Sequence, residues 1–253
     1  MIPTVLSIAG LDPSGGAGMA ADLKTATMMG TYGMAALTTV TIQHPGAVEE
    51  VSPLPARLVK AQIQTLLQHM PIGAIKIGLL GTTDIANAVM HVLQDTNIPM
   101  VLDPVTHSTS GTAMGEVDET VMTHLMERAH IVTPNNDELT GVVGGWSPAE
   151  WANHTATAVL CTGGHSHAEA IVDVLWVPNK GRREWSRPRI ETVHTHGTGC
   201  TISTAIAAGL AKGHSIERAV EEAISFTHQA VQHSTEGGLV DTNGPLLHFK
   251  MND

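Results

Sequence analysis

The sequence predicts a single α/β domain in which helices cover both faces of a mainly parallel sheet. Short apolar, β-branched runs alternate along the chain with segments of helical spacing, which is the order of strands joined by helical crossovers. The 253 residues fit one large domain, and no repeat, low-complexity stretch or linker divides residues 1–253. Closely packed layers also suit the composition, since only 3% of the residues are aromatic and 25 are glycine.

Each element follows from its local pattern. Residues 4–9 (TVLSIA) predict a strand that enters the glycine-rich loop GLDPSGGAG at 10–18, and helical spacing follows from Met19. Further strands are predicted over 35–42, 74–80, 98–105, 130–133 and 157–164, and helices over 55–70, over 83–93 with Thr82 or Thr83 as its cap, over 116–127, and briefly after Pro134 and Ser147.

The last third of the chain does not continue the alternation of strands and helices. Residues 168–193 contain two β-like runs around the turn PNKGRR, which favours an antiparallel pair. Two helices are then expected over 199–213 and 215–234, with Gly213 ending the first.

The charge balance limits the partners. Thirteen Lys and Arg against 24 Asp and Glu give a net charge of −11, which argues against binding to nucleic acid or to an anionic membrane. No apolar run approaches the roughly 20 residues that span a bilayer. The two cysteines, Cys161 and Cys200, cannot form a disulfide framework, and no secretory signal is recognisable. We therefore expect a cytoplasmic protein that holds any anionic ligand locally.

A candidate anion site lies at the segment HGTGCT (196–201), just before an Ala-rich helix. Its glycines let backbone N–H groups approach a ligand, and the helix dipole favours negative charge there. Cys200 falls in the first turn, where the pKa of a thiol tends to be lowered, so it could act as a base or a polarising group. The alternatives are an ordinary glycine-rich helix start and a buried, inert cysteine.

Candidate metal ligands follow two of the predicted strands. Asp103 ends one strand, and Asn135 and Glu138 follow the next. Carboxylates at strand ends can hold Mg²⁺ together with its waters, as phosphoryl transfer requires. Helix and turn capping would equally explain these residues. The pairs His165/His167 and His194/His196 have zinc-like spacing, but nothing completes a four-ligand set.

A candidate pocket for a small ligand surrounds the first loop. GLDPSGGAG is neither a Walker A motif nor a convincing GxGxxG, so its glycines predict only a tight loop. Asp22 could accept a hydrogen bond from a ligand amine or hydroxyl, or could be a solvated helix carboxylate. Gln43 offers an amide that can pair with the edge of a heterocycle.

The chain resembles the hydroxymethylpyrimidine/phosphomethylpyrimidine kinases, the thiamine-pathway branch of the ribokinase-like superfamily, over nearly its whole length. The resemblance implies a single-domain, three-layer α/β/α sandwich. Seven segments carry it in the family's order: SIAGLDPSGGAGMAADLKT (7–25), KIGLL (76–80), VLDPV (101–105), TPNNDEL (133–139), GGH (163–165), HGTGCT (196–201) and GPLLHF (244–249).

The resemblance further implies an activity. ATP would phosphorylate 4-amino-5-hydroxymethyl-2-methylpyrimidine at its hydroxymethyl group, and then phosphorylate the monophosphate, with Mg²⁺ as the metal and a homodimer as the assembly. Asp22 and Gln43 would grip the pyrimidine, in a pocket lined by Gly10, Ala17, Thr41 and Leu79. Gly197, Thr198, Gly199 and Cys200 would form the anion hole, with Cys200 where most of the superfamily has an Asp base. Asn135, Thr162, Gly164, His196 and Thr198 would contact the nucleotide, and Asp103 and Glu138 the metal.

Three departures from the family pattern leave alternatives open. Thr162 replaces the usual Lys before GGH, Gln43-His44-Pro45 replaces Q-N-T, and Thr106 replaces the Met after DPV. A pyridoxal or pyridoxine kinase of the same fold is one alternative. A non-catalytic vitamer-binding protein on the same scaffold is the other.

Overall fold

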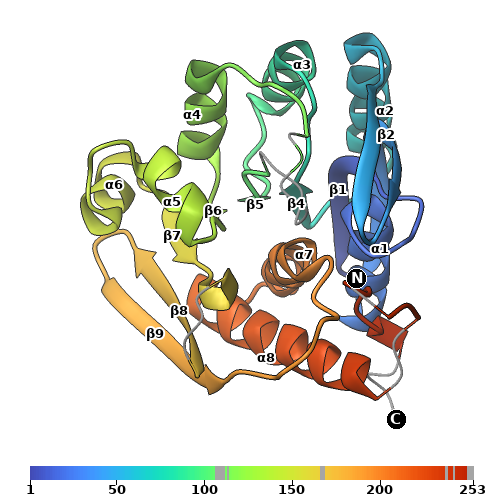
Figure 1. The fold of residues 1–253 in the computed structure, drawn as a ribbon. Coiled ribbons are helices and arrows are strands. Elements are labelled where there is room, and N and C mark those ends of the chain that lie inside the picture. The colour runs from blue at the N-terminus through green and yellow to red at the C-terminus, as the bar shows by residue number, and fades with distance from the viewer. Residues whose placement is uncertain (106–111, 113, 166–168, 237–238, 242, 250–253) are drawn as a thin grey trace.

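The computed structural model has a central sheet with helices on both faces, as predicted (Figure 1). The structure describes residues 1–105, 112, 114–165, 169–236, 239–241 and 243–249. Within these residues the sheet has nine strands in the order β3-β2-β1-β4-β5-β6-β7-β8-β9. Their bounds are β1 Thr4–Leu11, β2 Tyr32–His44, β3 Ala47–Pro53, β4 Ala74–Ile77, β5 Met100–Leu102, β6 Ile131–Val132, β7 Ala158–Cys161, β8 Ala170–Val177 and β9 Gly181–Pro188.

The pairing of the strands is parallel in the middle of the sheet and antiparallel at both margins. Strands β2, β1, β4, β5, β6 and β7 pair in parallel, while β3 pairs antiparallel with β2, and β8 with both β7 and β9. The β8–β9 hairpin predicted from PNKGRR is confirmed, with Asn179 and Gly181 at positive φ in its turn.

Two layers of helices bury the two faces of the sheet. Side chains alternate along β1, so that Val5 packs with one layer while Leu6 and Ile8 pack with the other. The first layer contains α1 (Gly18–Met28), α7 (Thr198–Ala211) and α8 (Ile216–Thr235). The second contains α2 (Ala56–His69), α3 (Thr83–Leu93), α4 (Glu119–Arg128), α5 (Asn136–Val143) and α6 (Pro148–Thr155).

Local signals explain most helix ends. The Thr82 side chain accepts a hydrogen bond from the Ile85 N–H and caps α3, which confirms one of the two expected caps. Gly213 follows α7 at a φ of +79°. The fourth helix begins at Glu119 rather than at 116, because the Asp118 side chain caps its first N–H groups.

Strand β3 was not predicted. Its sequence AVEEVSP has two adjacent glutamates and no buried residue, so it lacks the apolar pattern of a core strand. It exists because it pairs with the long β2 as an edge ribbon, where charged residues are common. Several core strands are also shorter than expected: β4 ends at Ile77, and β7 ends at Cys161 before a short 3₁₀ turn over Gly163–His165.

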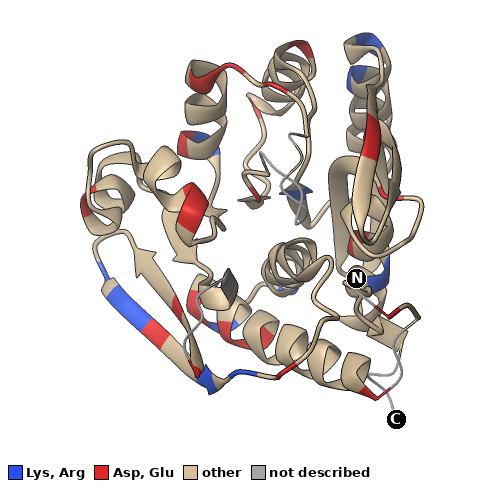
Figure 2. Cartoon of the chain, in the orientation of Figure 1, with Lys and Arg blue, Asp and Glu red and all other residues tan. Residues whose placement is uncertain are grey.

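The strand order places the site. The chain proceeds from β1 to β2 on one side of β1 and from β4 to β9 on the other, so the order reverses between β1 and β4. Ligands of doubly wound sheets bind outside the carboxyl ends of the strands at such a reversal. Basic residues, in contrast, gather on β9 at the margin of the sheet (Figure 2). No helix in the described part of the chain is long and apolar enough to cross a membrane.

Candidate active site

The loop after β1 is tied together by one carboxylate. Asp12 accepts hydrogen bonds from the Ser14 N–H at 2.8 Å, the Ser14 hydroxyl at 2.9 Å and the Ala17 N–H at 2.9 Å. The Gly15 and Gly16 N–H groups also find acceptors within the loop. The N–H groups of residues 14–17 therefore have acceptors within the protein and are not free to bind phosphate, in agreement with the absence of a Walker A motif.

The start of α7 is different, because part of its backbone is free. Gly197 caps the helix at a φ of +86°, a conformation that favours glycine. Within the described residues, the N–H groups of Gly199 and Cys200 have no hydrogen-bond acceptor. In the predicted anion hole at Gly197, Thr198, Gly199 and Cys200, these N–H groups are thus available as donors at the positive end of a helix dipole.

The thiol of Cys200 lies between the two loops but does not have the lowered pKa expected from its helix position. Its sulfur accepts a hydrogen bond from the Gly18 N–H at 3.4 Å. Burial raises the pKa of Cys200 to about 12, and the opposing charge of Lys76 offsets this only in part. Cys200 is consequently a protonated thiol at neutral pH, so the expected lowering of its pKa is wrong, while its role in the site stays a prediction.

Asp22 lies beneath the site in a buried network. Its carboxylate receives the ammonium of Lys76 at 3.0 and 3.1 Å, the Ser7 hydroxyl at 2.5 Å and the Thr204 hydroxyl at 2.8 Å. The side chain is 1% exposed, so the solvated-carboxylate alternative is wrong. Both oxygens already have partners in the protein, and a direct grip on the substrate stays a prediction for Asp22.

Lys76 is the cation that the sequence interpretation overlooked. It is fully buried on β4, where its apolar neighbours in AIKI gave no signal of a charged centre. Burial alone would lower the pKa of Lys76, but the Asp22 carboxylate raises it above its usual value. One permanent positive charge therefore lies under the start of α7, and it acts electrostatically on both Cys200 and Asp103.

The two predicted metal ligands, Asp103 and Glu138, are carboxyl groups close enough to affect each other electrostatically. Burial raises the pKa of Asp103, which also accepts a hydrogen bond from the Ser203 hydroxyl at 3.3 Å. Burial, reinforced by the negative charge of Asp103, raises the pKa of Glu138 to about 7. Among the described residues no group of three or more His, Cys, Asp or Glu side chains could hold a metal. Two carboxylates that repel each other suit a hard cation which keeps several waters, and Mg²⁺ is such a cation.

Asn135 and Glu138 also cap α5, as the alternative interpretation held. The Asn135 side chain accepts from the N–H groups of Asp137 and Glu138, and Glu138 accepts from the Asn135 N–H at 3.1 Å. This capping box fixes the Glu138 carboxylate at the carboxyl end of β6. Capping and metal binding are compatible, because this bond engages one oxygen of Glu138 and leaves the other without a partner in the described part.

The residues predicted to line the substrate pocket gather where β1, β2 and β4 end. A Cβ built on Gly10 would lie 2.3 Å from the Thr39 hydroxyl and 3.0 Å from Leu79, so only glycine fits there. The Thr41 hydroxyl donates to the Leu11 carbonyl at 2.9 Å and lies 3.1 Å from Gln43 Oε1. This bond orients the Gln43 side chain, whose NH₂ group has no partner among the described residues.

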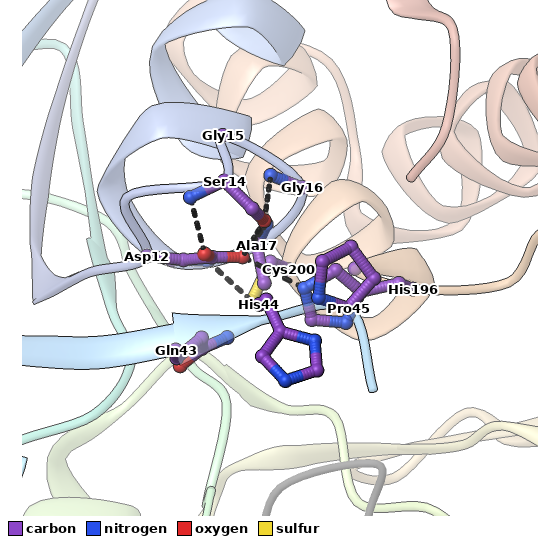
Figure 3. A network of polar contacts seen from close by, with 12 residues as sticks. Asp12, Ser14, Gly15, Gly16, Ala17, Gln43, His44, Pro45, His196 and Cys200 are labelled. Atoms are coloured by element: carbon purple, nitrogen blue, oxygen red, sulfur yellow. Dashed lines mark hydrogen bonds and ion pairs between the residues drawn. The ribbon is translucent and has the colours of Figure 1, made fainter. Parts of the chain in front are cut away.

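The residues predicted to contact the nucleotide are brought together only in part. Thr162 and Asn135 pair as neighbouring backbone positions at the ends of β7 and β6. The Gly164 carbonyl accepts a hydrogen bond from Arg189 at 3.3 Å, which puts a guanidinium beside the segment that lacks the family Lys. His196 does not join them: its Nε2 lies 2.7 Å from Asp12 Oδ2, on the side of the first loop (Figure 3).

Two of the three departures from the family pattern, Thr162 and the segment Gln43-His44-Pro45, fall on residues that the structure describes. His44 ends β2, and its Nδ1 accepts the Gly46 N–H at 3.1 Å. The Pro45 carbonyl accepts a hydrogen bond from Asn243, which ties the β2–β3 turn to the tail. Thr106 and His167 lie outside the described residues, so the structure does not address the predictions that involve them.

Comparisons with known proteins identify the family of the chain. The family model described as phosphomethylpyrimidine kinase matches residues 12–246. A hydroxymethylpyrimidine/phosphomethylpyrimidine kinase of Streptomyces coelicolor is 38% identical over 241 residues, which cover 90% of this chain and 88% of that protein.

Solved structures of two kinases superpose on the chain. The ADP complex of pyridoxal kinase from Bacillus subtilis covers 100% of this chain and 99% of its own, at a TM-score of 0.87 and 30% identity. Phosphomethylpyrimidine kinase from Clostridium difficile covers 91% of this chain and 100% of its own, at a TM-score of 0.75 and 32% identity. The ribokinase-like α/β/α fold and the kinase assignment are confirmed. The chain belongs to the phosphomethylpyrimidine kinase family.

Proposed function

We propose that the protein transfers the terminal phosphoryl group of ATP to the hydroxymethyl group of 4-amino-5-hydroxymethyl-2-methylpyrimidine, and then to the resulting monophosphate, in the making of thiamine. The observation that carries this proposal is the pair of free N–H groups at Gly199 and Cys200, at the point where the strand order reverses. Family membership supplies the substrate class.

The substrate side of the site is small and polar at one edge. The Thr41 hydroxyl engages the side-chain oxygen of Gln43. The NH₂ group of Gln43 would therefore donate a hydrogen bond to a ring nitrogen of the pyrimidine. Gly10 lies on β1, Leu79 follows β4 and Ala17 is the N-cap of α1, and a flat ring would bind between them. A heterocycle held there would direct its hydroxymethyl group toward the start of α7.

Phosphoryl transfer in this site depends on positioning and charge. The N–H groups of Gly199 and Cys200 would stabilise negative charge on the transferring group as the bond to the leaving oxygen lengthens. The Cys200 thiol keeps its own proton, so its sulfur would accept a hydrogen bond from the substrate hydroxyl and orient it rather than deprotonate it at the outset. A largely dissociative transition state needs little help from a base.

The nucleotide and its metal would occupy the ends of β5, β6 and β7. Asp103 and Glu138 would hold Mg²⁺, which supplies positive charge that neutralises the phosphates. Asn135, Thr162, Thr198 and Gly164 would face the nucleotide, with Arg189 beside Gly164 as a cation. The ADP complex of the Bacillus subtilis relative supports a nucleotide in this fold. A homodimer and a cytoplasmic location remain predictions.

The test compares two substrates under the same conditions. Purified protein, ATP and Mg²⁺ are supplied with hydroxymethylpyrimidine or with pyridoxal, and products are separated by mass so that monophosphate and diphosphate are distinguished. We expect both pyrimidine products. A strong preference for pyridoxal would establish the second candidate, whose fold the pyridoxal kinase from Bacillus subtilis shares with this chain. Saturable binding without any product would identify a vitamer-binding protein.

A further inference from the structure

A buried pair of side chains joins the two glycine loops of the site. The Nε2 of His196 and the Oδ2 of Asp12 lie 2.7 Å apart, with 8% and 3% of their side chains exposed. The two residues are 184 positions apart in the sequence, and each belongs to a different loop (Figure 3). This contact is therefore a long-range bond between the substrate loop and the anion hole.

The other hydrogen bonds of His196 and Asp12 show which of the two side chains holds the other. The Nδ1 of His196 has no hydrogen-bond partner in the described part of the chain, so the ring is engaged only through the nitrogen that donates to Asp12. Burial alone would raise the pKa of Asp12, but hydrogen bonds from His196 and Ser14 hold this pKa below its usual value. An ionised carboxylate at the centre of the loop thus receives donors from both sides.

The backbone around the pair is shaped to let the loops touch. A Cβ built on Gly16 would lie 2.4 Å from the His196 ring, and a Cβ built on Gly197 would lie 1.9 Å from the Gly16 carbonyl oxygen. Neither position admits a side chain. Gly18 adds a third link, because its N–H donates to the Cys200 sulfur. The loop over residues 12–18 is therefore contacted by the His196 ring, the Gly197 cap and the Cys200 thiol.

We propose that His196 is a positioning residue that acts through Asp12 to set the spacing between the substrate loop and the N–H groups at the start of α7. His196 directly precedes the helix cap, so a bond from its ring to Asp12 fixes the cap against residues 12–17. The proposal rests on the proposed kinase function and differs from the expectation that His196 contacts the nucleotide.

The test uses two His196 variants and one matched control. His196→Leu removes the donor to Asp12. His196→Gln places an amide donor near the position of Nε2. The control is His214→Leu, because His214 forms a comparable pair with Glu222 at 3.0 Å at the start of α8. Each variant is assayed well below its unfolding midpoint, with KM for ATP, KM for the pyrimidine and kcat measured separately.

A positioning role affects the transition state more than ground-state binding. We expect His196→Leu to lower kcat by roughly 30- to 300-fold, in the range for misplaced transition-state donors, with both KM values within about 3-fold. His196→Gln should recover at least about a tenth of the wild-type kcat, and His214→Leu should stay within about 2-fold. A raised KM for ATP at unchanged kcat would show that His196 contacts the nucleotide. An equal kcat in His196→Gln and His196→Leu would show that the hydrogen bond to Asp12 does not matter. Either result overturns the proposal.

A second readout needs no substrate, so it keeps this proposal separate from the proposed function. If the pair holds the loop over Cys200, its loss should speed alkylation of that thiol by iodoacetamide by about 10-fold or more, scored by peptide mass against buried Cys161. Asp12→Asn, which keeps the side-chain shape, should act in the same direction if His196→Leu fails to fold. Unchanged alkylation in both variants overturns the proposal even if the wild-type protein proves to phosphorylate another substrate. Failure of wild-type turnover with faster alkylation in the variants would reject the proposed function alone.

Discussion

The ammonium group of Lys76 lies 3.0 Å from the Oδ2 of Asp22, and neither side chain is exposed to solvent. A buried ion pair contributes little net stability when intact, but removal of one partner leaves the other charge without compensation. Lys76→Met should therefore lower the free energy of unfolding by about 3–5 kcal/mol, measured by urea denaturation. Substitution of both partners, Lys76→Met with Asp22→Leu, should recover part of this loss.

The matched control for that prediction is an exposed pair. Lys180 and Glu217 also lie 3.0 Å apart, but the Lys180 side chain is 65% exposed. Lys180→Met should change the free energy of unfolding by less than about 1 kcal/mol, as is usual for surface pairs. Equal losses in the two lysine variants would contradict the argument from burial.

Cys200 should matter for turnover more than for binding. Cys200→Ala removes the sulfur that would orient the substrate hydroxyl, so kcat should fall by roughly 100-fold or more while binding of the pyrimidine is largely kept. Since the pKa of Cys200 is raised to about 12, no ionisation of this thiol should appear in the pH profile of kcat between about 6 and 9. Unchanged turnover in Cys200→Ala would remove Cys200 from the mechanism.

Glu138 should make the metal-free protein less stable as the pH rises. The pKa of Glu138 is about 7 in the folded chain, against an ordinary value of 4.5. The folded state therefore holds a proton that the unfolded state has released, and its stability declines between about pH 4.5 and 7. Glu138→Gln, which can keep the capping box, should abolish that decline in urea denaturation followed across this range. An identical decline in the variant would show that Glu138 is not its source.

His248 should produce the opposite slope. Burial lowers the pKa of His248 to about 4, and its Nε2 pairs with the Thr201 hydroxyl at 2.9 Å. The unfolded chain gains a proton first, so stability falls as the pH drops from about 6.5 toward 4. His248→Gln should remove this loss and leave the Glu138 slope in place, and each variant thus serves as the control for the other. A steeper acid loss in His248→Gln would refute the assignment.

Gln43 should affect affinity for the pyrimidine. Gln43→Ala removes one or two hydrogen bonds worth about 1–1.5 kcal/mol each, so KM for the pyrimidine should rise roughly 5- to 150-fold while KM for ATP changes little. Gln94→Ala is the control, since Gln94 is exposed and, in the part of the chain that the structure describes, its side chain bonds only to Asp95. A change in the KM for ATP of the same size would place Gln43 outside the pyrimidine pocket.

The parts of the fold that depend on local pattern were predictable from the sequence. Alternating apolar runs and helical spacing gave the parallel core, and Thr82, Ser147 and Gly213 marked helix ends where the structure has them. Strand β3 could not be predicted in the same way, because its pairing with β2 rather than its own apolarity makes it a strand. Local sequence does not report a partner of that kind.

The candidate site shows the same division. The glycines of HGTGCT indicate a backbone anion hole, and the N–H groups of Gly199 and Cys200 have no acceptor among the residues that the structure describes. The thiol pKa was predicted in the wrong direction, because burial outweighs the helix dipole and burial depends on the whole fold. Lys76 was missed because a lysine inside an apolar strand looks like an exception until Asp22, 54 residues away, is placed beside it.

The bond between Asp12 and His196 also has a consequence for how the protein is made. A ribosome synthesises the N-terminal half of a chain first, and that half can begin to fold before the remainder exists. Asp12 must wait for a partner 184 residues later, so the nascent chain carries an incomplete site through most of its synthesis. Contacts of such long range form late and slowly. Catalytic competence should therefore arise in one late step of maturation and not by gradual increments along the growing polypeptide.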